Sequence, residues 1–361
     1  MVNLMTASSQ WANRPDDERF LSLGGLRSAV QARKFDSIEL KKTLSELQLH
    51  PLDGEIVLRD GFEDTRLTHW AFGQLARLAK APAGYLRTLP PELAVIPLSW
   101  SLDKAGDYPG RLLLHEPPRA DSPADRTARA ITSQSYGRIW DIDVVQALEA
   151  NIDPDVWKVP SASYASSDPL KATTLYASDR DVFVFLVNED HEIEVPGSNG
   201  SDVLYRGFFA WNSETGSKTF GLTTFMYRYI CDNRIVWGAQ EITELRIRHS
   251  SGGPGRFVRE AEPFLRRYLE AGTGPVVEQI EAAQAKEVAT SEEKTVEWLR
   301  GKGFTQGLAL TAARKAKEED GNPRSVWNLV QALTSQAQQT QHTDERVAIE
   351  TKAGKLMATV S

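Results

Sequence analysis

The sequence predicts an α+β fold, with a mostly antiparallel sheet core, packed helices and a helical C-terminal region. Short apolar runs separated by turn-forming residues dominate the middle of the chain and are typical of antiparallel strands. After Arg256 the apolar spacing becomes helical and stays so to the end. With 361 residues and 41% apolar residues, the chain can bury a sizeable core. We expect an N-terminal arm at 1–64, a core domain at 65–270 and a helical region at 271–361.

The first 64 residues are polar and broken up, with one helical candidate from Leu23 to Leu47 that is interrupted near Phe35. This pattern predicts a loosely docked arm. From Thr68, "THWAFGQLARLAK" has apolar residues near helical spacing, and Thr68 is suited to be its N-cap. Pro82 should end this helix and open a second one, "PAGYLRTL".

The middle of the chain predicts strands. They are "RLLLHE" at 111–116, "TARAITSQSYGRIW" at 127–140 with a turn at Tyr136-Gly137, a hairpin in "TTLYASDRDVFVFLV" at 173–187, and "VLYRGFFAWN" at 203–212. The prolines and aspartates of 117–126 indicate a loop. The segment "DIDVVQALEA" predicts a helix capped by Asp141 or Asp143.

The last quarter of the chain predicts helices only. The first should begin at Pro263 and stop at Gly272. The others are expected at Val276 to Lys286, Glu292 to Arg300, Thr305 to Lys317, Ser325 to Gln338 and Thr343 to Thr359.

Bulk properties exclude several classes of protein. The net charge of −7 gives the whole molecule no attraction for a polyanion, so a nucleic-acid interface must be local. The single cysteine, Cys231, excludes an internal disulfide framework. No segment has the pattern of a secretory signal or the ~18 apolar residues of a membrane-spanning helix, so we expect a cytoplasmic protein without a membrane partner.

The densest cluster of aromatic and basic residues is "RGFFAWNSETGSKTFGLTTFMYRYICDNRI" at 206–235. It divides into a strand, the turn "NSETGS" and a predicted helix whose apolar face contains Leu222, Phe225, Met226, Tyr229 and Ile230. Such a face usually belongs to the core. Outside it remain Arg206, Lys218, Tyr227, Arg228 and Arg234.

Further along, "ELRIRHSSGGPGRFVRE" alternates Leu245 and Ile247 with Arg246 and Arg248, which predicts a strand with one apolar and one basic face. The glycines at 252, 253 and 255 predict a loop whose amides approach a phosphate, and two arginines follow it.

Between Tyr205 and Tyr268 ten basic residues face six acidic ones, so this window carries +4 and the remainder −11. Basic grooves with aromatic platforms are typical of single-strand-binding proteins. The predicted nucleic-acid-binding residues are Arg206, Lys218, Tyr227, Arg228, Arg234, Arg246, Arg248, Arg256 and Arg259. A solvated charged face of an acidic protein would explain the same residues.

Two other segments are weaker candidates. Residues 75–89 resemble a helix-turn-helix, although Lys80 stands where such turns favour glycine. The segment "NEDHEIE" at 188–194 has Asp190, His191, Glu192 and Glu194 close together in sequence. Because strand residues alternate, His191 can share a face with Glu189, or Asp190 with Glu192 and Glu194, and a metal-dependent nuclease could be built there. A charged strand end explains it more simply. No other pattern predicts catalytic residues, a cofactor or a metal site.

The segments "ITSQSYGRIWDIDVVQAL", "DRDVFVFL", "GFFAWNSETGSKTFGLTTFMYRYICDN", "WNLVQALTSQAQ" and "HTDERVAIETKAGKL" together resemble the phage- and plasmid-borne proteins carrying domain of unknown function 932. The resemblance covers roughly residues 65–355. The family's asparagines correspond to Asn212 and Asn233, which the sequence itself explains as a turn former and a helix end. The family has no settled activity, and its association with mobile elements favours a role in DNA processing.

The leading hypothesis is therefore a protein of a mobile element that binds, or anneals, single-stranded DNA, with a possible homo-oligomer adding up weak sites. The alternatives are a protein-interaction module that inhibits or recruits a host protein, and the metal-dependent nuclease.

Overall fold

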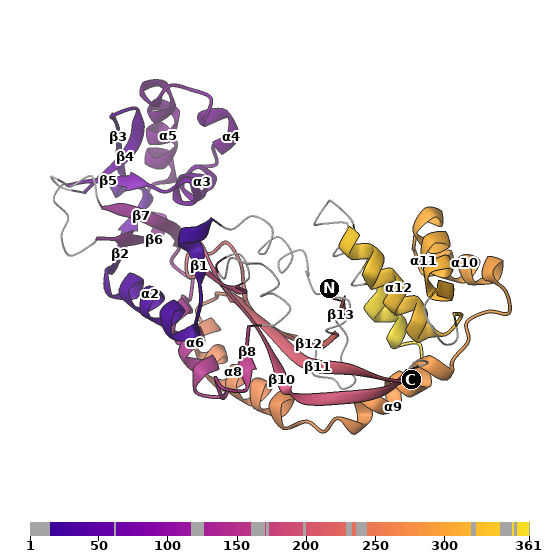
Figure 1. Ribbon diagram of the computed structural model, residues 1–361. Coiled ribbons are helices and arrows are strands. Elements are labelled where there is room, and N and C mark those ends of the chain that lie inside the picture. The colour runs from indigo at the N-terminus through magenta and orange to yellow at the C-terminus, as the bar shows by residue number, and fades with distance from the viewer. Residues whose placement is uncertain are drawn as a thin grey trace.

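The computed structural model describes residues 15–60, 63–116, 126–159, 170, 173–197, 200–228, 233–235, 244–318, 323–339, 349 and 352–360. They form an eight-stranded sheet, a six-stranded sheet and the helices around them, and the predicted α+β class is confirmed. Neighbouring strands are antiparallel apart from one parallel pair, β5 with β7. Figure 1 shows the six-stranded sheet and the C-terminal helices at opposite ends of the long eight-stranded sheet.

The eight-stranded sheet has the order β1-β9-β10-β11-β12-β13, with β14 also paired to β12 and β8 to β10. Its strands are β1 (Arg19–Phe20), β8 (Trp157–Lys158), β9 (Leu175–Ala177), β10 (Val182–Gly197), β11 (Gly200–Asn212), β12 (Phe220–Arg228), β13 (Asn233–Ile235) and β14 (Glu244–Ile247). The long hairpin of β10 and β11 runs through its centre, with a register shift between Asn188 and Ile193. β9 and β10 pair antiparallel, which confirms the hairpin predicted at 173–187, and β11 contains the strand predicted at 203–212.

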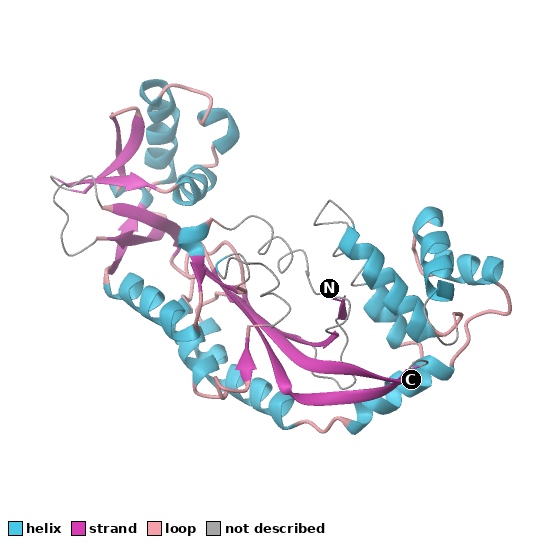
Figure 2. Cartoon of the chain, in the orientation of Figure 1, coloured by secondary structure: helices cyan, strands magenta, loops and turns pink. Residues whose placement is uncertain are grey.

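Three helices cover one face of this sheet: α2 (Leu23–Phe35), α6 (Asp141–Glu149) and α8 (Gly253–Glu270). Figure 2 shows them along the outer curve of the sheet. Because side chains alternate along a strand, every second residue of β10 reaches these helices, and Val182, Val184 and Leu186 join Phe264 and Leu265 of α8 in one core.

The six-stranded sheet has the order β2-β6-β7-β5-β4-β3. Its strands are β2 (Ser37–Thr43), β3 (Gln48–Leu52), β4 (Glu55–Asp60), β5 (Glu63–Leu67), β6 (Pro109–His115) and β7 (Thr127–Ser133). The helices α3 (His69–Leu78), α4 (Ala83–Leu86) and α5 (Pro91–Ala105) form a core with it. Thr68 caps α3 as predicted, accepting from the amide of Ala71 at 3.1 Å.

The expected N-terminal arm is instead part of both sheets. β2 to β4 lie within residues 1–64, and Leu26 and Val30 of α2 are 0% and 1% exposed in the core of the eight-stranded sheet. The predicted helix to Leu47 ends at Phe35 and is followed by β2 and the short 3-10 helix η2 (Leu44–Glu46). Pairing with β6 along all seven residues of β2 outweighs the helical pattern.

The C-terminal region is helical as predicted. It contains α9 (Gly274–Ala285), α10 (Glu292–Gly301), α11 (Gln306–Glu318) and α12 (Val326–Gln339), which share one core. The last predicted helix, Thr343 to Thr359, is described only in part, and residues 352–357 of it are helical. Most of the predicted loop at 117–126 lies outside the described residues.

Three local predictions are wrong. The segment predicted as a helix after the "NSETGS" turn is strand β12, which pairs with β11 on one side and with β13 and β14 on the other. α8 begins at Gly253 rather than Pro263, so the predicted glycine loop forms the start of a helix that continues past its internal proline. Asp141 is the first residue of α6, but neither it nor Asp143 is a cap, since Trp140 holds that position.

Candidate nucleic-acid interface

Strand β14 presents two of the predicted arginines to solvent. Ile247 is 0% exposed while Arg246 and Arg248 on either side of it are exposed, so the predicted apolar and basic faces are confirmed. The Arg246 guanidinium lies 5.7 Å from the ring centre of Trp211 and forms an ion pair with Glu244. The side chain of Arg248 has no hydrogen bond or ion pair with any described residue.

The first turns of α8 hold two more. Arg256 forms an ion pair with Glu260 at 2.7 Å. Arg259 lies back over the first turn, with Nη1 at 3.2 Å from where a β-carbon on Gly255 would stand. Its side chain has no hydrogen bond or ion pair with a described residue. The hydrogen bond from Arg256 lowers the pKa of the neighbouring Glu260, and the charge of Arg259 helps to lower it. The first turn contains no acidic residue and the N-cap, Gly252, provides no side-chain bond. Arg256 and Arg259 are cations near the positive end of the α8 dipole, which is an unfavourable position for a positive charge. This helix start therefore favours the binding of an anion.

A tight turn joins the strand to the helix. The amide of Ser250 donates to the Arg248 carbonyl at 2.8 Å, and the amide of Gly253 donates to the Ser250 carbonyl at 2.7 Å. A β-carbon on Gly253 would lie 2.4 Å from the Arg248 oxygen, so only glycine fits there. These contacts join the end of β14 directly to the start of α8, and Arg246 lies over Trp211 on the sheet face opposite α8. We call Arg246, Arg248, Arg256 and Arg259 the β14–α8 arginine group.

Arg206 is not part of this surface. It is 8% exposed, and its guanidinium donates to the carbonyls of Tyr268 at 3.1 Å and Gly272 at 2.8 Å. These carbonyls lie at the C-terminal end of α8, where a helix leaves its last acceptors unpaired and attracts a cation. Burial lowers the pKa of Arg206 from its usual value. Arg206 therefore caps α8 from strand β11.

No described contact brings the remaining predicted residues to the β14–α8 arginine group. Lys218 forms an ion pair with Asp181. The backbone of Tyr227 pairs with that of Arg234, and Arg228 pairs with Asn233, across β12 and β13. The side chains of Tyr227, Arg228 and Arg234 lie outside the described part of the chain.

The sequence did not predict a row of stacked aromatic rings on the sheet face opposite α6 and α8. The ring centres of Tyr176 and Phe183 are 6.1 Å apart, those of Phe183 and Phe209 5.8 Å, and those of Phe209 and Trp211 5.5 Å. All four rings are at most 3% exposed. The alternation of aromatic residues in β10 and β11 was the available signal. Because these rings are buried, we assign them to the fold.

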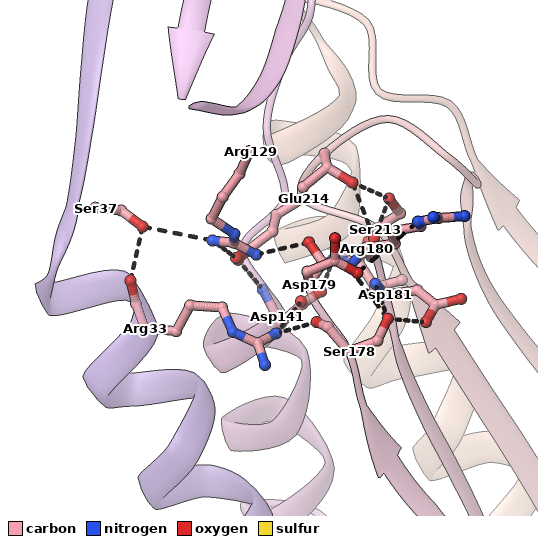
Figure 3. A network of polar contacts seen from close by, with 12 residues as sticks. Arg33, Ser37, Arg129, Asp141, Ser178, Asp179, Arg180, Asp181, Ser213 and Glu214 are labelled. Carbon is pink, nitrogen blue, oxygen red and sulfur yellow. Dashed lines mark hydrogen bonds and ion pairs between the residues drawn. The ribbon is translucent and has the colours of Figure 1, made fainter. Parts of the chain in front are cut away.

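The "NSETG" turn is also buried, contrary to its polar composition. Its residues Asn212, Ser213, Glu214 and Thr215 are at most 1% exposed. Glu214 forms an ion pair with Arg129 of β7 at 2.6 Å and accepts from the backbone amide of Asp141 at 3.2 Å. Figure 3 shows this network between the two sheets.

Asn212 and Asp141 complete that network. The Asn212 amide donates to Asp141 Oδ1 and to the Ile139 carbonyl, both at 2.8 Å, so it ties two segments together instead of opening the turn. Burial raises the pKa of Asp141 well above its usual value, and the Glu214 carboxylate adds to the rise. Trp70 and Gln74 of α3 donate to the Thr215 carbonyl at 3.1 and 2.8 Å. The turn thus fastens the six-stranded sheet to the eight-stranded one.

The two weaker candidates lack the geometry they would need. In residues 75–89, α4 has only four residues, which is too short for a recognition helix, and Lys80 adopts a φ of 55° in the turn. At the β10 irregularity, the side chain of Asn188 accepts from the amides of Asp190 and His191, both at 3.1 Å. Among the described residues, no three histidine, cysteine or acidic side chains gather as a metal site.

Asn233 lies in β13, so its predicted role at a helix end is wrong. Within the described residues there is also no helix long and apolar enough to cross a membrane.

Comparison with known proteins gives one match. The family model "Domain of unknown function (DUF932)" matches residues 163–356, which include β9 to β14 and α8 to α12. No curated protein and no solved structure matches the chain. Since the match spans more than half of the 361 residues, the chain belongs to the family that carries domain of unknown function 932.

Proposed function

We propose that this protein binds single-stranded nucleic acid through the β14–α8 arginine group. The observation that carries the proposal is the position of Arg248 and Arg259, whose exposed side chains have no hydrogen bond or ion pair with a described residue, beside the uncapped start of α8. A phosphate bound there would offset the repulsion between these cations and the helix dipole.

The residue type supports a nucleic acid over a small anion. Arginine heads are planar, contact phosphate with two parallel hydrogen bonds and stack on exposed bases. Val258, between Arg256 and Arg259, is 75% exposed and offers an apolar contact to a base. Such contacts are available in a single strand, whose bases are not stacked inside a duplex.

Arg246 and Arg256 each have an acidic neighbour, so their contribution depends on exchanging an exposed ion pair for a phosphate. Exposed pairs of this kind contribute only about 0–1 kcal/mol, so the exchange is inexpensive. The group therefore offers up to four phosphate contacts, although the chain as a whole is acidic.

The test is fluorescence anisotropy with labelled single- and double-stranded oligonucleotides over a range of salt concentrations. Four phosphate contacts predict that the logarithm of the binding constant falls with the logarithm of salt concentration with a slope of about −2.8 for a single strand. We expect the single strand to bind more tightly than the duplex. Absence of binding at low salt would disprove the proposal.

Two variants distinguish binding by the β14–α8 arginine group from an effect of the protein's net charge on affinity. The double variant Arg248→Glu/Arg259→Glu should weaken binding by at least roughly tenfold and flatten the salt slope. Arg314→Glu, in α11, also reverses an exposed arginine and is the control, with no expected effect of that size. An equal loss in both would show that only the net charge matters.

A further inference from the structure

Helix α5 has apolar side chains on two opposite faces. The face toward the six-stranded sheet is formed by Ala94, Leu98 and Leu102, which are at most 1% exposed. The outward face is formed by Leu93, Ile96 and Trp100, which are 54%, 63% and 63% exposed. A helix that is apolar on both faces is typical of one that is covered on both.

The three outward residues form a single stripe. Their spacing of three and four residues places them on one side of the helix over two turns. Single exposed apolar residues are ordinary, but a contiguous stripe with a tryptophan is characteristic of an interaction surface. Trp100 alone offers on the order of 150 Å² of apolar area at this exposure. We call Leu93, Ile96 and Trp100 the α5 stripe.

The charges beside the α5 stripe fit a second copy of the chain. Asp103 and Lys104 are both exposed, and consecutive residues of a helix point about 100° apart, so they flank the stripe on opposite edges. Lys104 Nζ lies 5.7 Å from the Trp100 ring centre, which fixes it at that edge.

Two copies of α5 can meet in parallel or antiparallel. In the parallel arrangement, the twofold axis brings Asp103 of each copy beside Lys104 of the other, and both pairs are attractive. The antiparallel arrangement brings Asp103 beside Glu92, an exposed residue on the same edge, and like charges repel.

We propose that α5 is a homodimer interface, in which the α5 stripes of two copies pack in parallel about a twofold axis. Trp100 and Ile96 of one copy then lie against the same residues of the other. Because each copy carries its own β14–α8 arginine group, the dimer presents two such groups to one polymer.

The first experiment measures the oligomeric state of the full chain by sedimentation velocity over a range of concentrations, without nucleic acid. We expect a dimer for the wild type and an increase of at least 100-fold in its dissociation constant for Trp100→Glu. Val258→Glu, a matched change at a 75% exposed residue of α8, should leave the dimer intact. A monomeric wild type would overturn the proposal and leave the stripe to another protein, and a dimer insensitive to Trp100→Glu would place the interface elsewhere.

The second experiment tests the parallel arrangement. In a Cys231→Ser background, Leu93→Cys is the only cysteine, and in the parallel arrangement oxidation should link the two copies of residue 93, because equal positions of the stripe face each other across the axis. In the antiparallel arrangement residue 93 of one copy faces residue 100 of the other, about 10 Å along the helix from its own copy, and no link forms. A dimer in which Leu93→Cys does not link would refute the parallel arrangement. Neither experiment uses nucleic acid, so their outcome is independent of the proposed function.

Discussion

Replacing Arg206 by methionine distinguishes a residue that holds the fold from one that binds a phosphate. The side chain is 8% exposed and donates to two carbonyls at the end of α8, so methionine would keep the apolar stem but leave both acceptors unpaired. Two hydrogen bonds from a charged donor contribute about 1.5–3 kcal/mol each. The guanidinium also lies 5.6 Å from the Tyr268 ring centre, which adds about 1 kcal/mol.

Burying the charged guanidinium of Arg206 is itself unfavourable, which offsets part of this loss. Desolvation of an ion costs several kcal/mol, and methionine avoids it. The lost contacts sum to roughly 4–7 kcal/mol, and relief of several kcal/mol of desolvation leaves a net loss of about 3 kcal/mol in the free energy of unfolding. For a cooperative unit of a few hundred residues this corresponds to a decrease of roughly 6–12 °C in Tm.

Thermal unfolding followed by circular dichroism measures this loss, and oligonucleotide binding is measured below the transition. We expect Arg206→Met to lower Tm while leaving the affinity of the folded protein unchanged. The control, Arg248→Met, changes an exposed arginine and should leave Tm within about 2 °C while weakening binding. An unchanged Tm together with weaker binding in Arg206→Met would refute the capping role.

Three further predictions concern buried groups. The pKa of Asp141 is raised in the folded protein, so its contribution to the stability of the fold is present at low pH and is lost as pH rises through that pKa. Asp141→Asn should therefore raise Tm at pH 7 and raise it less near pH 4. Asp143→Asn, at a residue of the same helix whose side chain is exposed, is the control. Burial lowers the pKa of His249 to about 4 from 6.5, so stability should fall as pH drops through this range, and His249→Gln should flatten the fall in a pH series of Tm. Gly221→Ala would place a β-carbon 2.0 Å from the Trp211 ring, and a loss of about 1–3 kcal/mol in denaturant titrations is expected; a smaller loss would show that the ring moves easily.

Strands and helices were predictable where one periodicity dominated. The alternation around Ile247 and the helices after residue 274 are examples, since neighbouring residues alone decide their pattern. The prediction for β12 failed because the apolar residues Leu222, Phe225 and Met226 of this central strand also satisfy helical spacing. Only its pairing with β11 and β14, which are separate segments, decides between the two.

The start of α8 shows a similar limit. Glycines and Pro254 suggested a loop, yet proline suits the first turn of a helix and Gly253 is required by the close Arg248 carbonyl. The exposed arginines of the β14–α8 arginine group were predicted as candidates from composition. The capping role of Arg206 was not, because the carbonyls it contacts lie more than 60 residues away.

The "NSETG" motif, which is part of the family resemblance, is buried. Residues Asn212 to Thr215 are at most 1% exposed and hold the two sheets together: the Glu214 side chain contacts Arg129 and the start of α6, and the Thr215 carbonyl accepts from Gln74. A buried carboxylate such as Glu214 is tolerated only with its partners in place, so substitution is costly whatever the protein does. Similarity at this motif therefore reports a shared fold. Evidence for the proposed function has to come from the exposed β14–α8 arginine group, where we expect a substitution to change binding without disturbing the core.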